Sequence, residues 1–260
     1  MRSLASLVVL LALLSVCFAG VRRPHFKILG KHVHPDATAK PFNPASKFVP
    51  LYGIDTSDSS RGAGQTICIV DAYGASTAQS DLAIFSSQNG LGTASFQKYD
   101  QNGGTNYPKD DPDDASGDGW GVETALDVQT AHLIAPAAKI VLVVTDSASD
   151  DDLAAGIQTC VDKGANHISL SFGGPEGDNG LDDALESAYE SGVSIFASAG
   201  DSGAEAESPA SSQYVVAVGG TNLRANSDGS FASETAWSGS GGGCSKYTAA
   251  IPEQKSAAGY

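Results

Sequence analysis

Short runs of apolar, often β-branched residues recur along the chain from residue 65 onward, and polar or glycine-rich stretches follow them. Continuous apolar runs of this length are typical of strands that are buried on both faces of a parallel sheet. They predict strands at 67–71, 140–144, 167–172, 193–197 and 214–218.

Helical patterns fill the intervals between these strands, at 77–88, 120–134, 150–163 and 180–191. Strands that alternate with helices at this spacing form a parallel sheet with helices on both faces. The predicted fold class is therefore α/β. The segment 101–119 is rich in Asp, Gly and Pro and is predicted to be a surface loop.

Residues 1–19 have the pattern of a secretory signal peptide. Arg2 gives the positive start, an apolar run extends from Leu7 to Phe18, and Ala19 closes a small-residue cleavage site. The run is too short to span a bilayer. We expect a secreted, extracellular protein, with a short basic arm or propeptide at 20–50 and a folded domain at 51–260.

Composition narrows the possible partners. The chain has 15 basic and 30 acidic residues, a formal net charge of −15 at pH 7. This balance argues against nucleic acid and against an anionic membrane surface, which both attract cationic proteins. No later segment is apolar for long enough to cross a membrane, so no membrane association is expected after signal cleavage.

The cysteines and acidic clusters give no metal or cofactor prediction. Cys68, Cys160 and Cys244 remain after the signal peptide, so at most one internal disulfide forms and one thiol is left over. No CxxC or CxxH spacing suggests zinc. The DDPDD cluster at 110–114 lacks the ligand spacing of an EF-hand loop, and a solvated loop is the better interpretation there.

Two carboxyl side chains four residues apart are the first candidates for chemistry. Glu123 and Asp127 lie in GWGVETALDVQTAH, where helical spacing puts them on one face. Because their neighbours are apolar, one carboxyl should keep its proton while the other stays ionised, and a shared proton suits a general base in acid. On spacing alone, two exposed acids on an ordinary amphipathic helix are the simpler interpretation.

A third acid follows a predicted strand. Asp201 lies in a Gly-Asp-Ser-Gly turn directly after the strand at 193–197. Sites in parallel sheets form at the carboxyl ends of the strands, so Asp201 can join the pair. A purely structural turn explains the same residues equally well.

Five segments together resemble the sedolisins, the serine-carboxyl peptidases with a subtilisin-like fold. In chain order they are GVETALDVQTAHLIAP, SLSFGG, FASAGDSGA, VVAVGGTNL and ETAWSGSGGG. The resemblance covers about 65–255 and implies a subtilisin-like parallel sheet with helices on both faces. It also implies a secreted serine-type endopeptidase that hydrolyses peptide bonds of polypeptide substrates at acid pH.

The resemblance assigns roles to the three acids. Glu123 matches the general base, Asp127 the acid that orients and charges it, and Asp201 the oxyanion-stabilising acid, which must be protonated to donate a hydrogen bond. One segment matches the strand that pairs with the backbone of a peptide substrate and walls the first specificity pocket. Its residues are Ser169, Leu170, Ser171, Phe172, Gly173 and Gly174.

Asp71 and His132 are two further candidates for the site. Asp71 ends the first strand, where subtilisins place their catalytic aspartate, but Gly121-Val122-Glu123 stands where a subtilisin would need histidine. His132 lies too far along the helix to replace Glu123. We therefore interpret Asp71 as structural or site-lining.

The chain departs from the family at the nucleophile. The family's serine lies in a Ser-Gly-Thr-Ser-like segment well after a GGGxS stretch, and no such segment occurs up to Tyr260. Ser245 matches the loop before the nucleophile and Ser202 follows the oxyanion acid, so neither is a substitute.

Three expectations follow from this departure. The fold is C-terminally incomplete and leaves apolar strands exposed. The family's calcium site lies in the missing part, so no cofactor is expected in this chain. The chain alone is inactive, as a fragment or truncated gene model of a peptidase; the alternative is a non-catalytic secreted pseudopeptidase that holds extended peptides on the SLSFGG edge.

Overall fold

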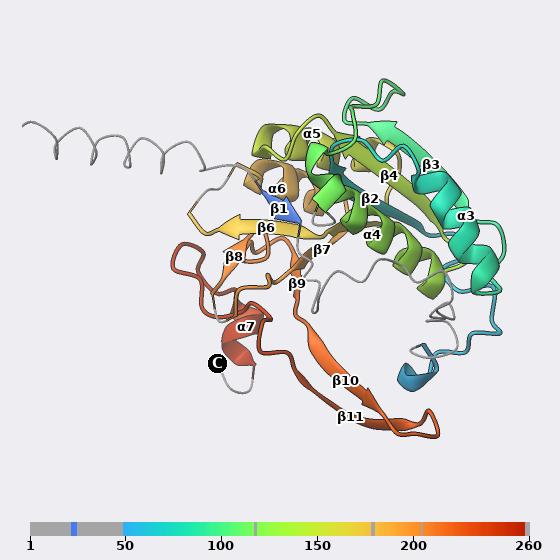
Figure 1. Cartoon of the computed structure of the whole chain (residues 1–260). Helices are drawn as coiled ribbons and strands as arrows, with labels where there is room; N and C mark the ends of the chain where they lie inside the picture. The colour runs from blue at the N-terminus through green and yellow to red at the C-terminus, as the bar shows by residue number, and fades with distance from the viewer. Residues whose placement is uncertain (1–21, 25–48, 117–118, 178–179, 204, 258–260) are drawn as a thin grey trace, which may run out of the picture.

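The computed structural model describes residues 22–24, 49–116, 119–177, 180–203 and 205–257. The predicted signal peptide and most of the 20–50 arm lie outside these residues. The central element of the described part is a six-stranded sheet in the order β3-β4-β2-β5-β7-β9, with every pair parallel (Figure 1). Its strands are β2 Thr66–Ala72, β3 Ser95–Asp100, β4 Lys139–Thr145, β5 His167–Leu170, β7 Ser194–Ser198 and β9 Val216–Val218.

Helices cover both faces of this sheet, as predicted. Helices α3 (Ala78–Gln88) and α4 (Trp120–Ile134) pack together on one face (Figure 1). Helices α5 (Asp150–Asp162) and α6 (Asp182–Glu190) pack together on the other face. The predicted α/β class, a parallel sheet with helices on both faces, is confirmed.

Strand alternation divides the core between the two faces. In β2, Ile69 packs with the α3/α4 core, whereas Cys68 and Val70 pack with the α5/α6 core. Because alternate residues point to opposite faces, Asp71 continues the Ile69 row towards the α4 face. The apolar runs of β2 and β4 are continuous because both of their faces are buried.

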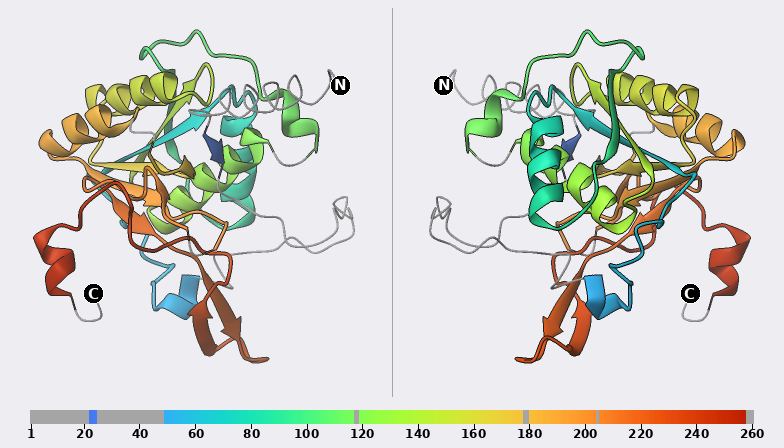
Figure 2. Two further views of the ribbon diagram at one scale, coloured as in Figure 1. Left: turned by 90° about the vertical axis from the view of Figure 1, so that its left-hand side faces the viewer. Right: turned by 90° about the vertical axis from the view of Figure 1, so that its right-hand side faces the viewer.

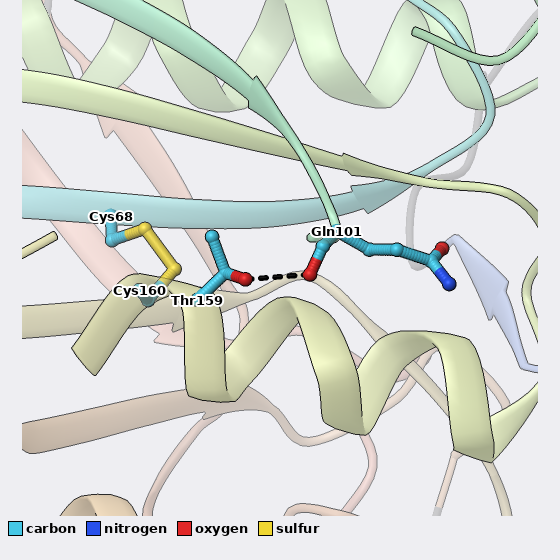
Figure 3. Close-up of a disulfide and its surroundings, with 4 residues drawn as sticks. All are labelled: Cys68, Gln101, Thr159 and Cys160. Atoms are coloured by element: carbon cyan, nitrogen blue, oxygen red, sulfur yellow. Dashed lines mark hydrogen bonds between the residues drawn. A yellow bond between two sulfur atoms is a disulfide. The ribbon is translucent and has the colours of Figure 1, made fainter. Parts of the chain in front are cut away.

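A disulfide ties the sheet to helix α5. Cys68 in β2 is bonded to Cys160 in α5, and both side chains are fully buried (Figure 3). Next to it, the Thr159 hydroxyl donates to the Gln101 carbonyl oxygen at 2.6 Å. Cys244 is free and exposed. The pairing that the sequence left open is therefore settled within the described residues.

The predicted strand at 167–172 is interrupted at Ser171, and β6 (Phe172–Pro175) leaves the central sheet. It pairs antiparallel with β1 (Arg23–Pro24) on one side and with β8 (Glu207–Ser208) on the other. The three strands form a small sheet in the order β1-β6-β8. The small part of the basic arm that is described is thus a strand on the folded domain.

The remaining elements are peripheral. Strands β10 (Thr221–Ala225) and β11 (Phe231–Ala236) form an antiparallel hairpin that extends away from the sheet (Figures 1 and 2). The short helices are η1 (Val49–Tyr52), η2 (Pro112–Ser116) and α7 (Pro252–Ser256). Val216 and Val218 of edge strand β9 are 53% and 50% exposed, which agrees with the expectation of uncovered apolar strands. Among the described residues, no helix has the length and apolar character needed to span a membrane.

Candidate active site

Glu123 lies in the first turn of α4 and is only 1% exposed, so the alternative of two exposed acids is wrong. The start of this helix is fixed by acids of the DDPDD cluster. Asp111 accepts the backbone N–H of Trp120 at 2.9 Å, and Asp114 accepts that of Gly121 at 2.7 Å. These two carboxylates satisfy N–H groups that the first helical turn leaves free, so they act as helix caps. The interpretation of the whole DDPDD cluster as a solvated loop is therefore wrong for Asp111 and Asp114.

Asp127 stands one turn after Glu123, and the two carboxyls share a hydrogen bond in which protonated Glu123 is the donor. Burial, followed by the negative charge of Asp127, raises the pKa of Glu123 well above its usual range. Burial also raises the pKa of Asp127, although the hydrogen bonds from Ser171 and Glu123 oppose this rise. The pair therefore keeps a proton to a pH far above that of ordinary carboxyls.

Asp71 is a third member of this acidic group. It is the penultimate residue of β2 and is fully buried, and burial followed by the charge of Asp127 raises its pKa well above the usual value. Its charge in turn contributes to the raised pKa of Glu123. Of the two roles that the sequence left open for Asp71, site-lining is the one that agrees with the structure.

Apart from the proton that Glu123 and Asp127 share, several buried oxygens of the three acids lack a well-aligned donor in the part of the chain that the structure describes. They are both carboxyl oxygens of Asp71, Glu123 Oε2 and Asp127 Oδ2, and the Thr124 hydroxyl near Asp71 opposes the rise in its pKa. Unsatisfied buried carboxyl oxygens destabilise a fold, so a concentration of them at one place indicates a functional site.

Ser171 links the acids to the segment predicted to bind substrate. Its hydroxyl donates to Asp127 Oδ1 at 2.9 Å, from the point where β5 ends and β6 begins. However, not every residue of the predicted substrate-binding segment Ser169–Gly174 has a backbone edge free to pair with a peptide. Ser169 has strands on both sides, paired with Ile69 and with Phe196, and therefore has no free backbone edge.

Leu170, which pairs with Ala197 in the central sheet and is buried, is not part of that edge either. The part of the predicted segment that lies outside the central sheet is β6, the middle strand of the β1-β6-β8 sheet. There Phe172 and Gly173 pair with Pro24 and Arg23, and Gly174 pairs with Ser208 on the other side.

Asp201 follows β7 at the carboxyl edge of the sheet and is half-buried. Its charge adds to the raised pKa of Glu123, so the two carboxyls lie within electrostatic reach. Gly200 has φ +99°, and a Cβ there would lie 2.5 Å from Glu207 Oε1. The turn is held by the glycine-rich segment at 239–243, where Gly241 donates to the Gly200 carbonyl at 2.8 Å and has no room for a side chain beside Ala199.

Other candidates do not join the acids. His132 is buried in the last turn of α4, where its Nε2 lies 3.2 Å from the Gly92 carbonyl oxygen. The Ser245 hydroxyl accepts the backbone N–H groups of Tyr247 and Thr248, so it sits in a turn. A cavity of about 730 Å³ near Ser245 is lined by residues of 199–257 and by none of the four acids. No group of three or more potential ligands among the described residues is arranged to hold a metal ion.

Comparison with known proteins gives consistent matches. The sequence model of the family described as "Subtilase family" matches residues 62–252. The chain is 29% identical to kumamolisin of Bacillus sp. (strain MN-32) over 84% of this chain and 42% of that protein. It is 30% identical to sedolisin of Pseudomonas sp. (strain 101) over 77% of this chain and 37% of that protein. The chain thus spans about two fifths of the length of these curated relatives.

A solved structure resembles the fold closely. It is the Pseudomonas sedolisin (serine-carboxyl proteinase) complexed with two molecules of pseudo-iodotyrostatin. The TM-score is 0.69 at 28% sequence identity, over 84% of this chain and 67% of that chain.

Proposed function

Because the chain belongs to the subtilase family and is a sedolisin-type, subtilisin-like protein, we propose that it supplies the acidic part of a serine-carboxyl endopeptidase site. The observation that carries the proposal is the buried Glu123–Asp127 pair beside Asp71 at the carboxyl edge of a parallel sheet. The substrate class is a polypeptide bound in extended form along β6.

The shared proton gives the pair its chemical role. A pair that carries one proton and one negative charge can accept a second proton. As a serine oxygen attacks the scissile carbonyl carbon, Glu123 passes its own proton to Asp127 and takes the hydroxyl proton, so both carboxyls are then protonated. The proton then passes to the leaving amine. Asp201 in its protonated form donates a hydrogen bond to the oxyanion.

These roles need acid conditions. Asp201 must carry a proton to be a donor, whereas the Glu123–Asp127 pair keeps its one proton to a much higher pH. The proposed activity is therefore confined to acid pH. The Cys68–Cys160 disulfide supports the proposed secretion, because disulfides persist mainly in oxidising compartments.

We place the nucleophilic serine outside this 260-residue chain. Ser171 donates to Asp127 but lies at the substrate edge, and Ser245 is held in a turn. The chain alone is accordingly proposed to be inactive, and the family's calcium site is placed with the serine. Without a metal or cofactor, the described residues would still bind and orient a peptide.

A second candidate function is a non-catalytic secreted peptide-binding protein. The observation that favours it is the antiparallel pairing of β1, a strand of the chain itself, with β6, where we propose that peptides bind. This protein would bind peptides at acid pH with no turnover.

The transcript distinguishes the two functions. We expect the reading frame beyond codon 260 to continue into a Ser-Gly-Thr-Ser-type segment, and the 260-residue chain to leave peptides intact between pH 3 and 7. An authentic stop at codon 261 in the mature transcript would reject the peptidase proposal and favour the binding protein.

A further inference from the structure

Arg22 is a buried arginine, and a buried guanidinium normally needs a carboxylate partner. It is 3% exposed, and its guanidinium lies against Asp150, which is 7% exposed. Nε donates to Asp150 Oδ1 at 2.6 Å and Nη2 donates to Asp150 Oδ2 at 2.9 Å, so the contact is bidentate. Nη1 donates to the Ser208 carbonyl oxygen at 3.2 Å.

The pocket is formed by the folded domain and fits a guanidinium group. Asp150 begins α5, Ser208 belongs to β8, and Gly174 of β6 leaves space, since a Cβ there would lie 3.3 Å from Arg22 Nη1. Asp182, at the start of α6, is also near: burial raises its pKa, and the positive charge of Arg22 opposes that rise. A lysine ammonium could not make the same planar, three-donor contact.

The backbone of residues 22–24 pairs with the folded domain in the way that an extended peptide pairs with a strand. The N–H of Arg22 donates to the Ala148 carbonyl oxygen at 2.8 Å. The next two residues then run antiparallel along β6, with Arg23 opposite Gly173 and Pro24 opposite Phe172. Strand addition of this kind supplies affinity through the backbone, while specificity comes from side-chain pockets beside the strand.

We propose that the Asp150 pocket is a specificity subsite that selects an arginine of an extended peptide, two residues before the one that lies opposite Phe172. Residues 22–24 of the chain are its resident occupant and must leave before another peptide can bind. This inference rests on the proposed function, because it takes β6 as the edge that receives substrate.

The alternative is that Arg22 only anchors the arm. The two differ when the occupant is removed. A subsite keeps its preference for a guanidinium in a separate peptide, because Asp150, Ser208 and Gly174 all remain. An anchor that depends on the covalent attachment of the arm is too weak to hold a separate peptide, so neither the arginine peptide nor its citrulline variants would bind.

The test measures binding of labelled peptides by fluorescence anisotropy at acid pH. The probe is Val-Arg-Arg-Pro-His-Phe, the sequence of residues 21–26, with two variants in which either the first or the second arginine is replaced by neutral citrulline. The protein is the full chain with Arg22→Ala, which empties the pocket; this chain is proposed to have no turnover of its own. Asp150→Asn is added to one sample and Asp151→Asn, an exposed neighbour on the same helix, to a matched control.

We expect the first citrulline to weaken binding at least tenfold and the second to change it less than threefold. Asp150→Asn should abolish this discrimination, and Asp151→Asn should leave it intact. The chain that keeps Arg22 should bind the arginine peptide at least tenfold more weakly, because its own residues compete.

Equal affinity for the arginine and first-citrulline peptides, or no binding of either, would overturn the inference. The comparison remains valid if Asp150→Asn does not fold, because the citrulline change is in the peptide alone. Binding is read without hydrolysis, so loss of the preference would reject the subsite only. Absence of acid hydrolysis would reject the proposed function only.

Discussion

The Ser171 hydroxyl donates to Asp127 Oδ1 at 2.9 Å, and so connects the segment proposed to receive a peptide with the acids proposed to act on it. Ser171 lies between the two strands, where the chain leaves the central sheet after β5 and enters β6. A change in the position of β6 on peptide binding would therefore act on the protonation of Asp127, and through Asp127 on Glu123.

Removing this hydroxyl should change the titration of the pair. In Ser171→Ala, the pKa of Asp127 should rise, because a hydrogen bond that lowers it is lost. Carboxyl NMR titration measures the effect directly. Ser187→Ala, at a half-buried serine of α6 whose hydroxyl donates to Gln158, is the control and should leave Asp127 unchanged. An unchanged or lower Asp127 pKa in Ser171→Ala would show that the bond does not form in solution.

The buried acids predict how stability depends on pH. Their folded-state pKa values are raised, so the folded chain binds more protons than the unfolded chain above about pH 4, where ordinary carboxyls titrate. The free energy of unfolding should therefore be largest in acid and should fall as the pH rises through the raised values.

Urea unfolding at a series of pH values measures this slope. Glu123→Gln should flatten it and raise stability near pH 7, since the amide cannot ionise. Glu190→Gln, at an exposed position at the end of α6, should keep the slope of the parent chain. Stability that increases from pH 4 to pH 7 in the parent chain would contradict the buried, protonated pair.

The disulfide should contribute a large part of the stability. Cys68 and Cys160 are separated by 92 residues, and their bond restricts the unfolded chain. Replacing both by alanine should lower the free energy of unfolding by about 2–5 kcal/mol. Cys244→Ala, at the exposed thiol, should have little effect. A loss of less than about 1 kcal/mol for the double variant would mean that the crosslink adds little.

The cap of α4 should be measurable as well. Asp111→Ala removes the acceptor of the Trp120 N–H and should lower the free energy of unfolding by about 1 kcal/mol. Thermal or urea unfolding gives the value, and Asp113→Ala, whose side chain is exposed, is the comparison. Equal effects of the two substitutions would show that capping is not the reason.

The sequence predicts the central strands well because both of their faces are buried, which leaves continuous apolar runs. Edge strand β3 carries no such signal: its residues are SFQKYD, and it pairs with β4 alone. The β10–β11 hairpin is missed for a similar reason, since nearly all of its residues are exposed. A strand that is buried on one face only, or on neither face, has no continuous run of apolar residues in its sequence.

The site is only partly readable from the chain. Glu123 and Asp127 are found by their helical spacing, and Asp201 by its turn after a strand. The break at Ser171 and the burial of Ser169 depend on which strands flank β5, and that is a property of the whole sheet. Likewise, the contact of Arg22 with Asp150 joins residues that are 128 positions apart, so no local sequence pattern predicts it.

The most direct test is the pH dependence of peptide hydrolysis by the product of the whole reading frame that contains this chain. Cleavage of a quenched peptide library should be confined to acid pH, and Glu123→Gln should lower kcat/KM by at least about a hundredfold, the scale of general-base catalysis, without weakening peptide binding. Cleavage that is fastest at neutral pH and survives Glu123→Gln would contradict the account.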